Sequence, residues 1–335
     1  MEILAYEVQH DEQPLLERAV RDRHAVRCLE VFLDEDTAPL AAGYRVVSTG
    51  VNARLDAPVL RRLAEGGTRM IAQRSTGFNN IDLPVAEELG FTVSRVAHYS
   101  PYAVAEFAWA LALAVDRRVV RAAHRAREFD FRLTGLMGRD IHGMTVGIIG
   151  TGKIGEVFTR IAHGFGCRLL GRDITENPTC LTLGLQYTDL DQLLAESDLI
   201  SLHLPLLPET HHLIDARALD LMKDDAILIN TGRGGLIDAH ALVETLRAGR
   251  LDGVGLDVYE EEAGLFYLDK SIGGITDDTL ARLMTFPQVL VSSHQAYFTR
   301  TAVGEIVDTT IRNIDDYLAG RTNENTLVPR TAQLM

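Results

Sequence analysis

Cysteine is scarce in this chain, with Cys28, Cys167 and Cys180 spread over 335 residues. They form no Cys-x-x-Cys motif and are too few for a disulfide framework, which excludes the small secreted proteins held together by disulfides. The opening stretch carries charge at Glu2 and lacks the apolar core of a signal peptide. We therefore expect a cytoplasmic protein.

Long hydrophobic runs and an excess of basic residues are missing as well. The longest strongly apolar run covers residues 107–115, whereas a membrane span requires about 18–20 residues. Lys and Arg total 33 against 47 Asp and Glu, so the net charge is −14. Because a phosphate backbone is bound by a basic surface, neither nucleic acid nor a membrane is an expected partner. Hydrophobic residues make up 46% of the chain, which is typical of a globular protein.

Short apolar runs alternate with helical patterns in the first hundred residues. At about 100–200 residues per domain, the length predicts two domains. Strand followed by helix builds a parallel sheet covered on both faces, so the fold class is α/β. The expected strands are 2–6, 25–33, 44–48, 69–72 and 91–96, and the expected helices are 57–65 and 83–89.

The same alternation returns after residue 144 and predicts a doubly wound unit of about six strands. Asp189 is the expected N-cap of one of its helices. The expected strands are 145–150, 168–171, 198–203, 226–231, 253–258 and 288–294. One helix is expected to begin at Lys153. The other expected helices cover 189–196, 215–222, 239–248 and 277–284.

Two further helices are expected outside these alternating segments. Residues 101–128 predict one long helix, apolar on most sides in its first half, where Trp109 lies. Such a helix is expected to be buried between domains or between subunits. Residues 301–319 predict an amphipathic helix that packs back onto the N-terminal part. No strand is expected after His294.

A glycine-rich turn is expected to bind a dinucleotide. Gly150-Thr-Gly152-Lys-Ile-Gly155 follows an apolar strand and opens a helix. The first glycine allows the tight turn, the second admits a pyrophosphate, and the third lets helix and strand pack closely. Asp173 follows at the end of the next strand, where a carboxylate binds the ribose hydroxyls of NAD and repels a 2′-phosphate. Its neighbour Arg172 is of a type that favours NADP, but adjacent strand residues point to opposite faces, so we predict NAD.

Three polar residues follow strands of this second unit and suit carbonyl reduction. Arg233, Glu262 and His294 each lie at or after a strand's carboxyl end, where open parallel sheets bind ligands. A protonated His can donate to a carbonyl oxygen, a carboxylate can orient the ring, and an Arg fork can grip a substrate carboxylate. Each residue also has a simpler interpretation as a surface charge or a strand-end histidine. Spacing alone cannot choose Glu262 among the three consecutive acids 260–262.

No metal site is predicted. His211 and His212 are adjacent in sequence, not at the i, i+4 spacing of helical ligands, and no Cys or Asp cluster accompanies them. Cys180 has no motif that would make it a nucleophile.

These motifs resemble the D-isomer-specific 2-hydroxyacid dehydrogenases over nearly the whole chain. The segments that carry the resemblance are VGIIGTGKIGEVFTRIAHGFGCRLLGRD, DLISLHLPLLPETHHLI and MKDDAILINTGRGGLIDAHALVETL. The stretch from GLDVYEEEAGLFYLDKS to SSHQAYFT is similar to the fermentative D-lactate dehydrogenase branch. The resemblance implies a Rossmann-type NAD-binding domain at 99–296 and a flavodoxin-like, discontinuous substrate domain at 1–98 and 297–335. Both sheets are expected to be parallel and doubly wound, and closure of the cleft would exclude water.

The resemblance also assigns roles to individual residues. It implies His294 as the acid/base, Glu262 as its partner and Arg233 on the substrate. The implied substrate contacts further include Thr76, Gly77, Tyr99 and Tyr297. The implied cofactor contacts are Gly150, Gly152, Lys153, Ile154, Gly155, Asp173, Leu204, Pro205, Thr210, Thr231, Gly232 and Asp257. A homodimer, or a dimer of dimers, is implied, with the 101–128 helix at the core of the interface.

The chain departs from the branch's usual pattern at four places. Phe107 replaces the His of VAEHA, and Ser75-Thr76 stand in a motif that usually reads RCAGFNN. Tyr297 replaces the Phe of HQAF, and Leu207 stands where Thr is common. The changes at Ser75-Thr76 and Tyr297 bear on the substrate pocket, because a phenolic hydroxyl beside a methyl group needs a partner or water.

The implied reaction is the reversible reduction of pyruvate to D-lactate, with hydride from NADH and the proton from His294. One alternative is the same chemistry on a larger aliphatic or aromatic 2-keto acid, or on hydroxypyruvate. A remote alternative is a non-catalytic NAD(H)-sensing scaffold, against which the intact Arg, Glu and His argue.

Overall fold

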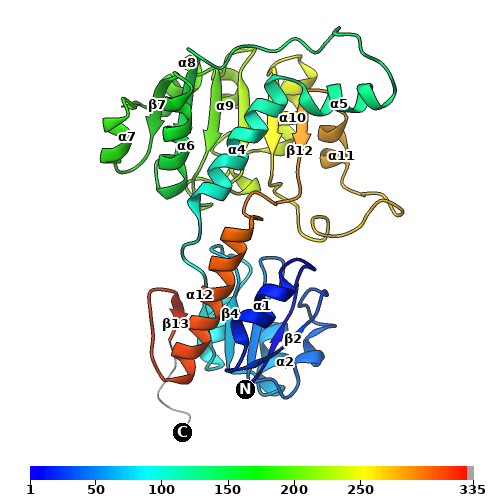
Figure 1. The fold of residues 1–335 in the computed structure, drawn as a ribbon, viewed down its shortest axis with the longest axis vertical. Helices are drawn as coiled ribbons and strands as arrows, with labels where there is room; N and C mark the ends of the chain where they lie inside the picture. The colour runs from blue at the N-terminus through cyan, green and yellow to red at the C-terminus, as the bar shows by residue number, and fades with distance from the viewer. Residues whose placement is uncertain (330–335) are drawn as a thin grey trace. The chain divides into compact units, whose positions relative to one another are not determined.

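The computed structural model describes residues 1–329, and the chain divides into two compact units (Figure 1). Unit 1 consists of Met1–Ser100 and the segment from Phe298 onward, and unit 2 is Pro101–Tyr297. Unit 1 is therefore built from both ends of the chain, while unit 2 is continuous. Within residues 1–329, every helix is too short or too polar to span a membrane.

Unit 1 is a six-stranded sheet in the order β13-β5-β4-β3-β1-β2, with helices on both faces. Strands β1 to β5 are parallel to one another, whereas β13 pairs with β5 in the antiparallel sense. The strands are β1 (Glu2–Ala5), β2 (Ala25–Cys28), β3 (Val46–Thr49), β4 (Met70–Gln73), β5 (Thr92–Ser94) and β13 (Thr326–Val328). The helices are α1 (Gln13–Val20), η1 (Ala38–Ala41), α2 (Ala57–Glu65), α3 (Leu83–Glu88) and α12 (Arg300–Leu318).

Alternating residues of these strands build two hydrophobic clusters, one on each face of the sheet. On one face Leu4, Val47 and Ile71 pack with α2 and α3. On the other, Ile3, Val46 and Met70 pack with Ile311 and Ile314 of α12. The predicted return of the last helix to the N-terminal part is therefore confirmed. The expectation of no strand after His294 is wrong, because β13 follows α12 and pairs with the edge strand β5. Its three residues were too short a run to be recognised from periodicity.

Unit 2 is a seven-stranded parallel sheet in the order β12-β11-β10-β9-β6-β7-β8, so it is doubly wound as predicted. The strands are β6 (Thr145–Ile149), β7 (Arg168–Arg172), β8 (Gln186–Tyr187), β9 (Leu199–Leu202), β10 (Ile227–Asn230), β11 (Gly253–Leu256) and β12 (Val289–Val291). The helices are α4 (Pro101–Asp116), α5 (Val119–Arg127), α6 (Lys153–Gly164), α7 (Pro178–Thr182), α8 (Leu190–Glu196), α9 (Ala216–Leu221), η2 (Gly234–Leu236), α10 (Ala239–Arg247) and α11 (Asp278–Thr285). The two-residue β8 and the short α7 were not expected, because runs this short carry no periodic signal.

Aspartate side chains begin many of the helices in both units. The carboxylate of Asp189 accepts a hydrogen bond from the backbone N–H of Gln192, as the sequence predicts. Such a cap satisfies a backbone donor that the helix itself leaves unpaired. The other aspartate caps are Asp56, Asp82, Asp215, Asp238 and Asp277.

The expected single helix over 101–128 is wrong: it is two helices, α4 and α5, with a break at Arg117 and Arg118. Arg118 has a left-handed backbone (φ 52°), and its guanidinium turns back to the carbonyl of Val115 and to Asp252. Asp116 is fully buried and accepts from the backbone N–H of Arg139. These buried contacts end α4. The sequence does not predict this end, because two consecutive arginines are compatible with a continuing helix.

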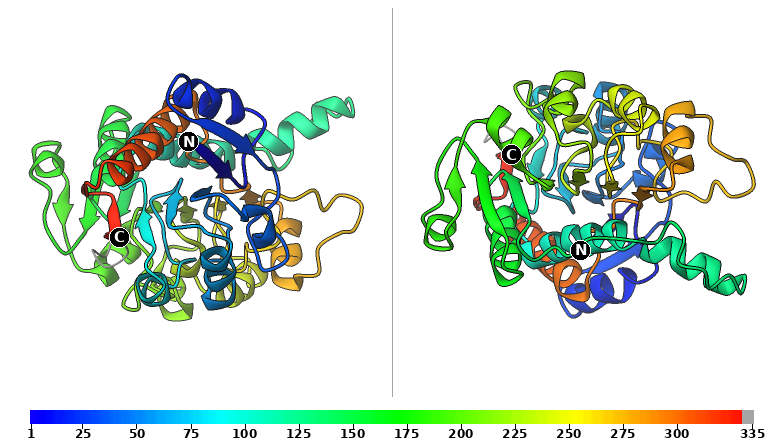
Figure 2. Two further views of the ribbon diagram at one scale, coloured as in Figure 1. Left: turned by 90° about the horizontal axis from the view of Figure 1, so that it is seen from below. Right: turned by 90° about the horizontal axis from the view of Figure 1, so that it is seen from above.

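The two helices have opposite surroundings. Helix α4 lies on the sheet of unit 2 against α6, β10 and β11, and Trp109 packs edge-on against Phe158. The burial of α4 is therefore within its own unit. Helix α5 has no buried residue and extends away from the rest of unit 2 (Figure 2).

Candidate active site

Most of the predicted site residues lie at one edge of the unit 2 sheet. The glycine turn follows β6, Asp173 follows β7, Arg233 follows β10, and His294 follows β12. Because all these strands are parallel, their carboxyl ends share this edge, where doubly wound folds bind ligands.

His294 and Glu262 form a hydrogen-bonded pair. The Nδ1 atom of His294 lies 2.7 Å from Oε1 of Glu262, and both side chains are largely buried. The other carboxylate oxygen, Oε2, accepts from the backbone N–H of Tyr259 at 3.1 Å. The ring is thus held by Nδ1, and Nε2 is the nitrogen left to meet a substrate.

Hydrogen bonds to the Asp257 carboxylate hold the loop that carries His294. This carboxylate is fully buried and accepts from the Ser292 hydroxyl at 2.6 Å and from the backbone N–H groups of Gln295 and Ala296 at 2.9 and 2.8 Å. Burial raises the pKa of Asp257, and these hydrogen bonds oppose the shift. Asp257 therefore orients the loop; the contact with the nicotinamide half that the resemblance implies stays a prediction.

Arg233 follows β10 and precedes the short helix η2. Its Nη1 donates to the carbonyl of Gly232 at 2.7 Å. No other hydrogen bond engages its guanidinium among residues 1–329, so most of its donors are open to an anion. The structure does not join Arg233 directly to Glu262 or His294.

The three consecutive acids lie in three different environments. Glu262 holds His294, while Glu260 binds Nε2 of His212 at 2.9 Å and the backbone N–H of Ala239 at 3.1 Å. Glu261 is exposed. The turn therefore distinguishes Glu262 from its neighbours, which spacing could not do.

The glycine turn has the shape of a dinucleotide site. A Cβ on Gly155 would lie 1.9 Å from the carbonyl oxygen of Gly150, so Gly155 is required by packing of the turn itself. A Cβ on Gly152 would meet nothing within 4 Å, and its φ of −65° is open to any residue. Since neither packing nor backbone demands Gly152, its lack of a side chain leaves room for a ligand. The same residue is the N-cap of α6 and supplies no side-chain cap, so the first N–H groups of α6 can bind an anion.

Further polar groups at this edge of the sheet fit NAD. The buried hydroxyl of Thr231 has no hydrogen-bond partner within residues 1–329, so it is available to a ligand. Asp173 follows β7 and binds the Thr151 hydroxyl at 3.1 Å, which fixes its carboxylate next to the turn. His203 directly follows β9; its backbone carbonyl lies against Gly150, and its ring packs against Phe158 of α6. Desolvation lowers the pKa of His203 to about 3, so its ring is neutral.

The remaining predicted cofactor residues lie in the same region of unit 2. Lys153 and Ile154 open α6, and Gly232 donates its N–H to Asn230. The Leu204 side chain lies beside Gly150. Thr210 closes the following loop by donating its hydroxyl to the carbonyl of Pro205 at 2.8 Å.

The predicted substrate residues at 76, 77 and 99 belong to unit 1. Thr76 donates its hydroxyl to the carbonyl of Val96 at 2.9 Å, and the carbonyl of Gly77 accepts from Ser75 at 2.7 Å. The loop after β4 is thus held by its own hydroxyls, including that of the unusual Ser75. Tyr99 follows β5 and is the residue before Ser100, where the first segment of unit 1 ends.

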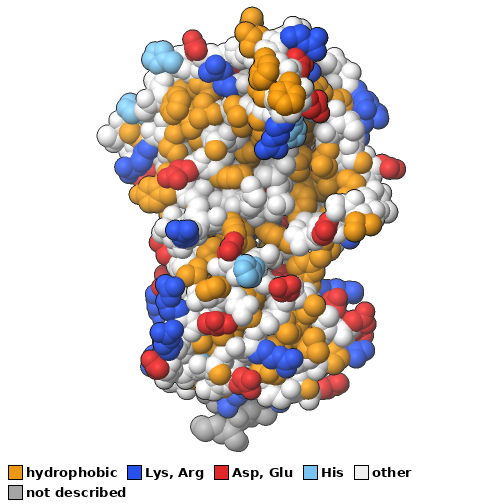
Figure 3. Space-filling model, turned by 45° about the vertical axis from the view of Figure 1, so that its right-hand side comes forward, with side chains coloured by type: hydrophobic (Ala, Val, Ile, Leu, Met, Phe, Trp, Pro, Cys, Tyr) orange, Lys and Arg blue, Asp and Glu red, His pale blue; other side chains and the backbone are white. Residues whose placement is uncertain are grey.

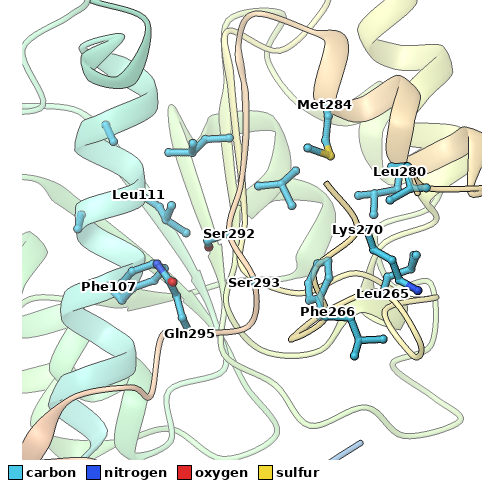
Figure 4. A pocket seen from close by; sticks show the side chains of 17 residues that line it. Phe107, Leu111, Leu265, Phe266, Lys270, Leu280, Met284, Ser292, Ser293 and Gln295 are labelled. Atoms are coloured by element: carbon cyan, nitrogen blue, oxygen red, sulfur yellow. The ribbon is translucent and has the colours of Figure 1, made fainter. Parts of the chain in front are cut away.

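Unit 2 also contains an apolar groove of about 830 Å³ (Figure 4). Phe107 and Leu111 of α4 face Phe266 and Met284 across it, with Ser292, Ser293 and Gln295 between them. The side chains of Arg233, Glu262 and His294 do not line it. Phe107, one of the departures, therefore lines this groove.

Sequence reasoning missed several residues that shape the site. They are Tyr267, Ser292, His203 and the pair His212–Glu260. Tyr267 donates its hydroxyl to the carbonyl of His294 at 2.6 Å, across an irregular segment whose path no periodic pattern predicts. Ser292 precedes His294 by two residues, and this proximity was the one available signal.

Known proteins resemble this chain along most of its length. Residues 109–296 match the family described as D-isomer specific 2-hydroxyacid dehydrogenase, NAD binding domain. The chain is 45% identical to 2-hydroxyacid dehydrogenase A of Aspergillus oryzae, over 98% of this chain and 95% of the relative. It is 48% identical to the D-lactate dehydrogenase kk1H of Curvularia clavata, over 90% and 87%. The solved structure of the pyruvate reductase of Chlamydomonas reinhardtii matches with a TM-score of 0.92 at 40% identity, covering 97% of this chain and 98% of that one.

Proposed function

Because this chain belongs to the D-isomer-specific 2-hydroxyacid dehydrogenases and is an NAD-dependent enzyme, we propose that it reduces pyruvate reversibly to D-lactate. The observation that carries the proposal is the His294–Glu262 pair at the ligand-binding edge of the unit 2 sheet. The relatives named for D-lactate and for pyruvate support this choice of substrate.

His294 acts as the general acid in the direction of reduction. Bound NADH supplies the hydride that adds to the carbonyl carbon. The proton on Nε2 of His294 goes to the carbonyl oxygen, and the Glu262 carboxylate stabilises the charged ring through Nδ1. In the reverse direction the neutral ring accepts the proton of the hydroxyl group.

Arg233 binds the keto acid. The open part of its guanidinium fork matches a carboxylate in two-point geometry and polarises the adjacent carbonyl. We assign Thr76, Gly77 and Tyr99 of unit 1 to the same substrate, together with Tyr297 at the end of unit 2. Unit 1 is then the substrate domain and unit 2 the cofactor domain.

The residues around the glycine turn hold the cofactor. We assign the pyrophosphate to the turn and the start of α6, and the ribose hydroxyls to Asp173. Thr231 and Asp257 belong to the nicotinamide half. The Asp173 carboxylate repels a 2′-phosphate, so NAD is preferred to NADP.

The enzyme is a cytoplasmic homodimer in this proposal. All three cysteines are free, as a reducing compartment requires. Unit 2 exposes large apolar side chains on α5 and on the segment after it, and a second copy would cover them. Figure 3 shows patches of hydrophobic side chains on the surface of unit 2.

Steady-state oxidation of NADH with four 2-keto acids tests the proposed reaction. Pyruvate, 2-oxobutyrate, phenylpyruvate and hydroxypyruvate are compared at matched concentrations, and the product from pyruvate is resolved on a chiral column. We expect the highest kcat/KM for pyruvate, with D-lactate as product. His294→Ala is expected to lower kcat by about 10²–10⁴-fold, because the proton donor is lost, while NADH binding is retained. His163→Ala, an exposed histidine on α6, is the matched control.

Each other outcome contradicts a stated part of the proposal. A higher kcat/KM for a bulkier or hydroxylated acid would overturn pyruvate and keep the reaction class. Turnover like that of the wild type in His294→Ala would overturn the acid. Tight NADH binding without turnover on any of the four acids would favour the NAD(H)-sensing scaffold.

A further inference from the structure

His294 has an unusual backbone conformation. Its φ of 53° is in the left-handed region, which residues with a side chain adopt rarely and only when their surroundings impose it. The backbone N–H of His294 donates to the carbonyl of Asp257 at 2.7 Å, and its own carbonyl accepts from the Tyr267 hydroxyl at 2.6 Å. The conformation of the catalytic histidine is thus fixed on both sides by hydrogen bonds.

Tyr267 is itself held in the left-handed region, with a φ of 62°. It lies in the irregular segment between β11 and α11, and its ring is roughly parallel to the His294 ring, with 6.3 Å between centroids. Two residues in rare conformations are therefore joined by one short hydrogen bond. Loss of that bond would release the carbonyl of His294 and with it the direction of the ring.

The hydroxyl of Tyr267 has a second neighbour, Tyr297. A side-chain hydrogen bond joins the two phenols. Since Tyr267 donates its proton to His294, its oxygen accepts from Tyr297. Burial, together with the nearby acids and this phenol, raises the pKa of Tyr267. Tyr267 therefore remains a neutral donor at every pH at which the enzyme would be assayed.

This arrangement explains how Tyr297 is accommodated in place of the usual phenylalanine. Its hydroxyl needs a partner, and Tyr267 provides one. Tyr297 follows His294 by three residues, so the chain of hydroxyls returns to the same loop that carries the histidine. The loop is fixed by Asp257 through Ser292 and by Tyr267 through the carbonyl of His294.

We propose that Tyr267, supported by Tyr297, is a positioning residue that holds His294 in line with Glu262 for proton transfer. The proposal rests on the proposed role of His294 as the acid. The titratable groups that face His294 are Glu262 at Nδ1, Asp257 below the loop and Tyr267 at the carbonyl. Only the phenol contributes no charge, so its effect is geometric.

Tyr267→Phe tests the proposal, with Tyr297→Phe and the double variant alongside. All are assayed on whichever of the four keto acids the wild type prefers. We expect Tyr267→Phe to lower kcat by about 10-fold or more, with KM and the Kd for NADH within about twofold of wild type. The alkaline limb of the pH–rate profile for reduction should move down by about one pH unit, because a misdirected ring is less well stabilised by Glu262 when protonated. Tyr297→Phe should have a smaller effect of the same kind.

The double variant and a matched control separate positioning from general destabilisation. In the double variant, loss of the Tyr297 hydroxyl should add nothing, since its partner is already gone. Tyr6→Phe removes a comparable tyrosine hydroxyl, which donates to the carbonyl of Thr37 at 2.9 Å in unit 1, and should leave kcat and the pH profile unchanged. Circular dichroism melting checks that each variant folds. If Tyr267→Phe does not fold, the shift of the pH profile in Tyr297→Phe decides.

Two results would overturn the proposal. One is a wild-type kcat and pH profile in Tyr267→Phe; the other is equal effects of Tyr267→Phe and Tyr6→Phe. A wild type without turnover, or an active His294→Ala, would instead overturn the proposed function itself. The two failures are therefore distinguishable.

Discussion

Glu260 and Glu262 are two residues apart, yet they hold different histidines for different purposes. Glu262 binds the ring of His294, while Glu260 joins His212 to the start of α10. His212 also donates its backbone N–H to the carbonyl of Gly235, in the short helix that follows Arg233. At the scale of single residues, Glu262 therefore orients the proposed proton donor His294, while Glu260 fixes the segment that carries Arg233, the proposed substrate-binding residue.

His203 makes stability depend on pH. Its folded pKa of about 3 lies below its ordinary value of 6.5, so folding favours the neutral ring. The contribution of the neutral His203 ring to the free energy of unfolding is fully present above about pH 6.5. It is lost as pH falls toward 3, by up to about 1.4 kcal/mol per pH unit. We expect the free energy of unfolding in urea to fall by up to about 2 kcal/mol more between pH 6.5 and 5 in wild type than in His203→Gln.

The exposed His163 provides the comparison for this experiment. His163→Gln should follow the wild-type pH dependence, because the exposed His163 ring keeps its contact with water when the chain folds. A His203→Gln variant with the wild-type slope would show that the ring is hydrated in the folded protein.

At the scale of elements, Gly152 at the start of α6 is expected to matter for cofactor binding and not for folding. Gly152→Ala should leave the melting temperature unchanged, because the new methyl group meets no protein atom within 4 Å. The methyl should obstruct the pyrophosphate and weaken NADH binding by about 10-fold or more, which corresponds to about 1.4 kcal/mol. Fluorescence titration with NADH and thermal melting measure the two effects separately.

Gly164→Ala is the control at the other end of the same helix, where an added Cβ also meets nothing within 4 Å. It should bind NADH as wild type does. Normal NADH affinity in Gly152→Ala would contradict the assignment of the pyrophosphate to the turn. A large loss of stability would mean that packing requires the glycine.

The long, strongly patterned elements were predictable from the sequence, and the short or irregular ones were not. The parallel sheets and helices such as α6 and α12 follow from hydrophobic periodicity and from caps such as Asp189. The end of α4 depends on where the side chain of Arg118 finds partners, and these lie outside its own helix. Local patterns contain no information about such distant contacts.

The candidate site divides in the same way. Arg233 and His294 were located because each follows a recognisable strand, and the glycine turn because its spacing is specific. Tyr267 could not be found, because its position depends on the path of an irregular segment with its own left-handed residue. Glu262 was chosen by resemblance, and the turn at Tyr259 supplies the physical reason.

At the scale of the whole molecule, the apolar segment after α5 predicts self-association. Phe131 and Leu133 are 73% and 81% exposed, and α5 beside them buries nothing in its own unit. Light scattering should give twice the 36.9 kDa mass of one chain. Replacing both residues by Asp should yield a monomer, while Leu40→Asp, an exposed leucine of unit 1, should remain dimeric. A wild-type monomer at assay concentrations would contradict the predicted dimer.

The discontinuity of unit 1 sets an order for folding during synthesis. Unit 2 is continuous and can fold as soon as it leaves the ribosome. The strands of unit 1 emerge first. Val20 of α1 packs on the face formed by Ile3, Val46 and Met70, but that face lacks Ile311 and Ile314 until α12 is made, and β5 has no neighbour on its outer edge until β13 follows. At about 5–20 residues per second, that wait is on the order of ten seconds or more. A nascent chain therefore leaves part of an apolar sheet face exposed to water while most of the enzyme is still being translated.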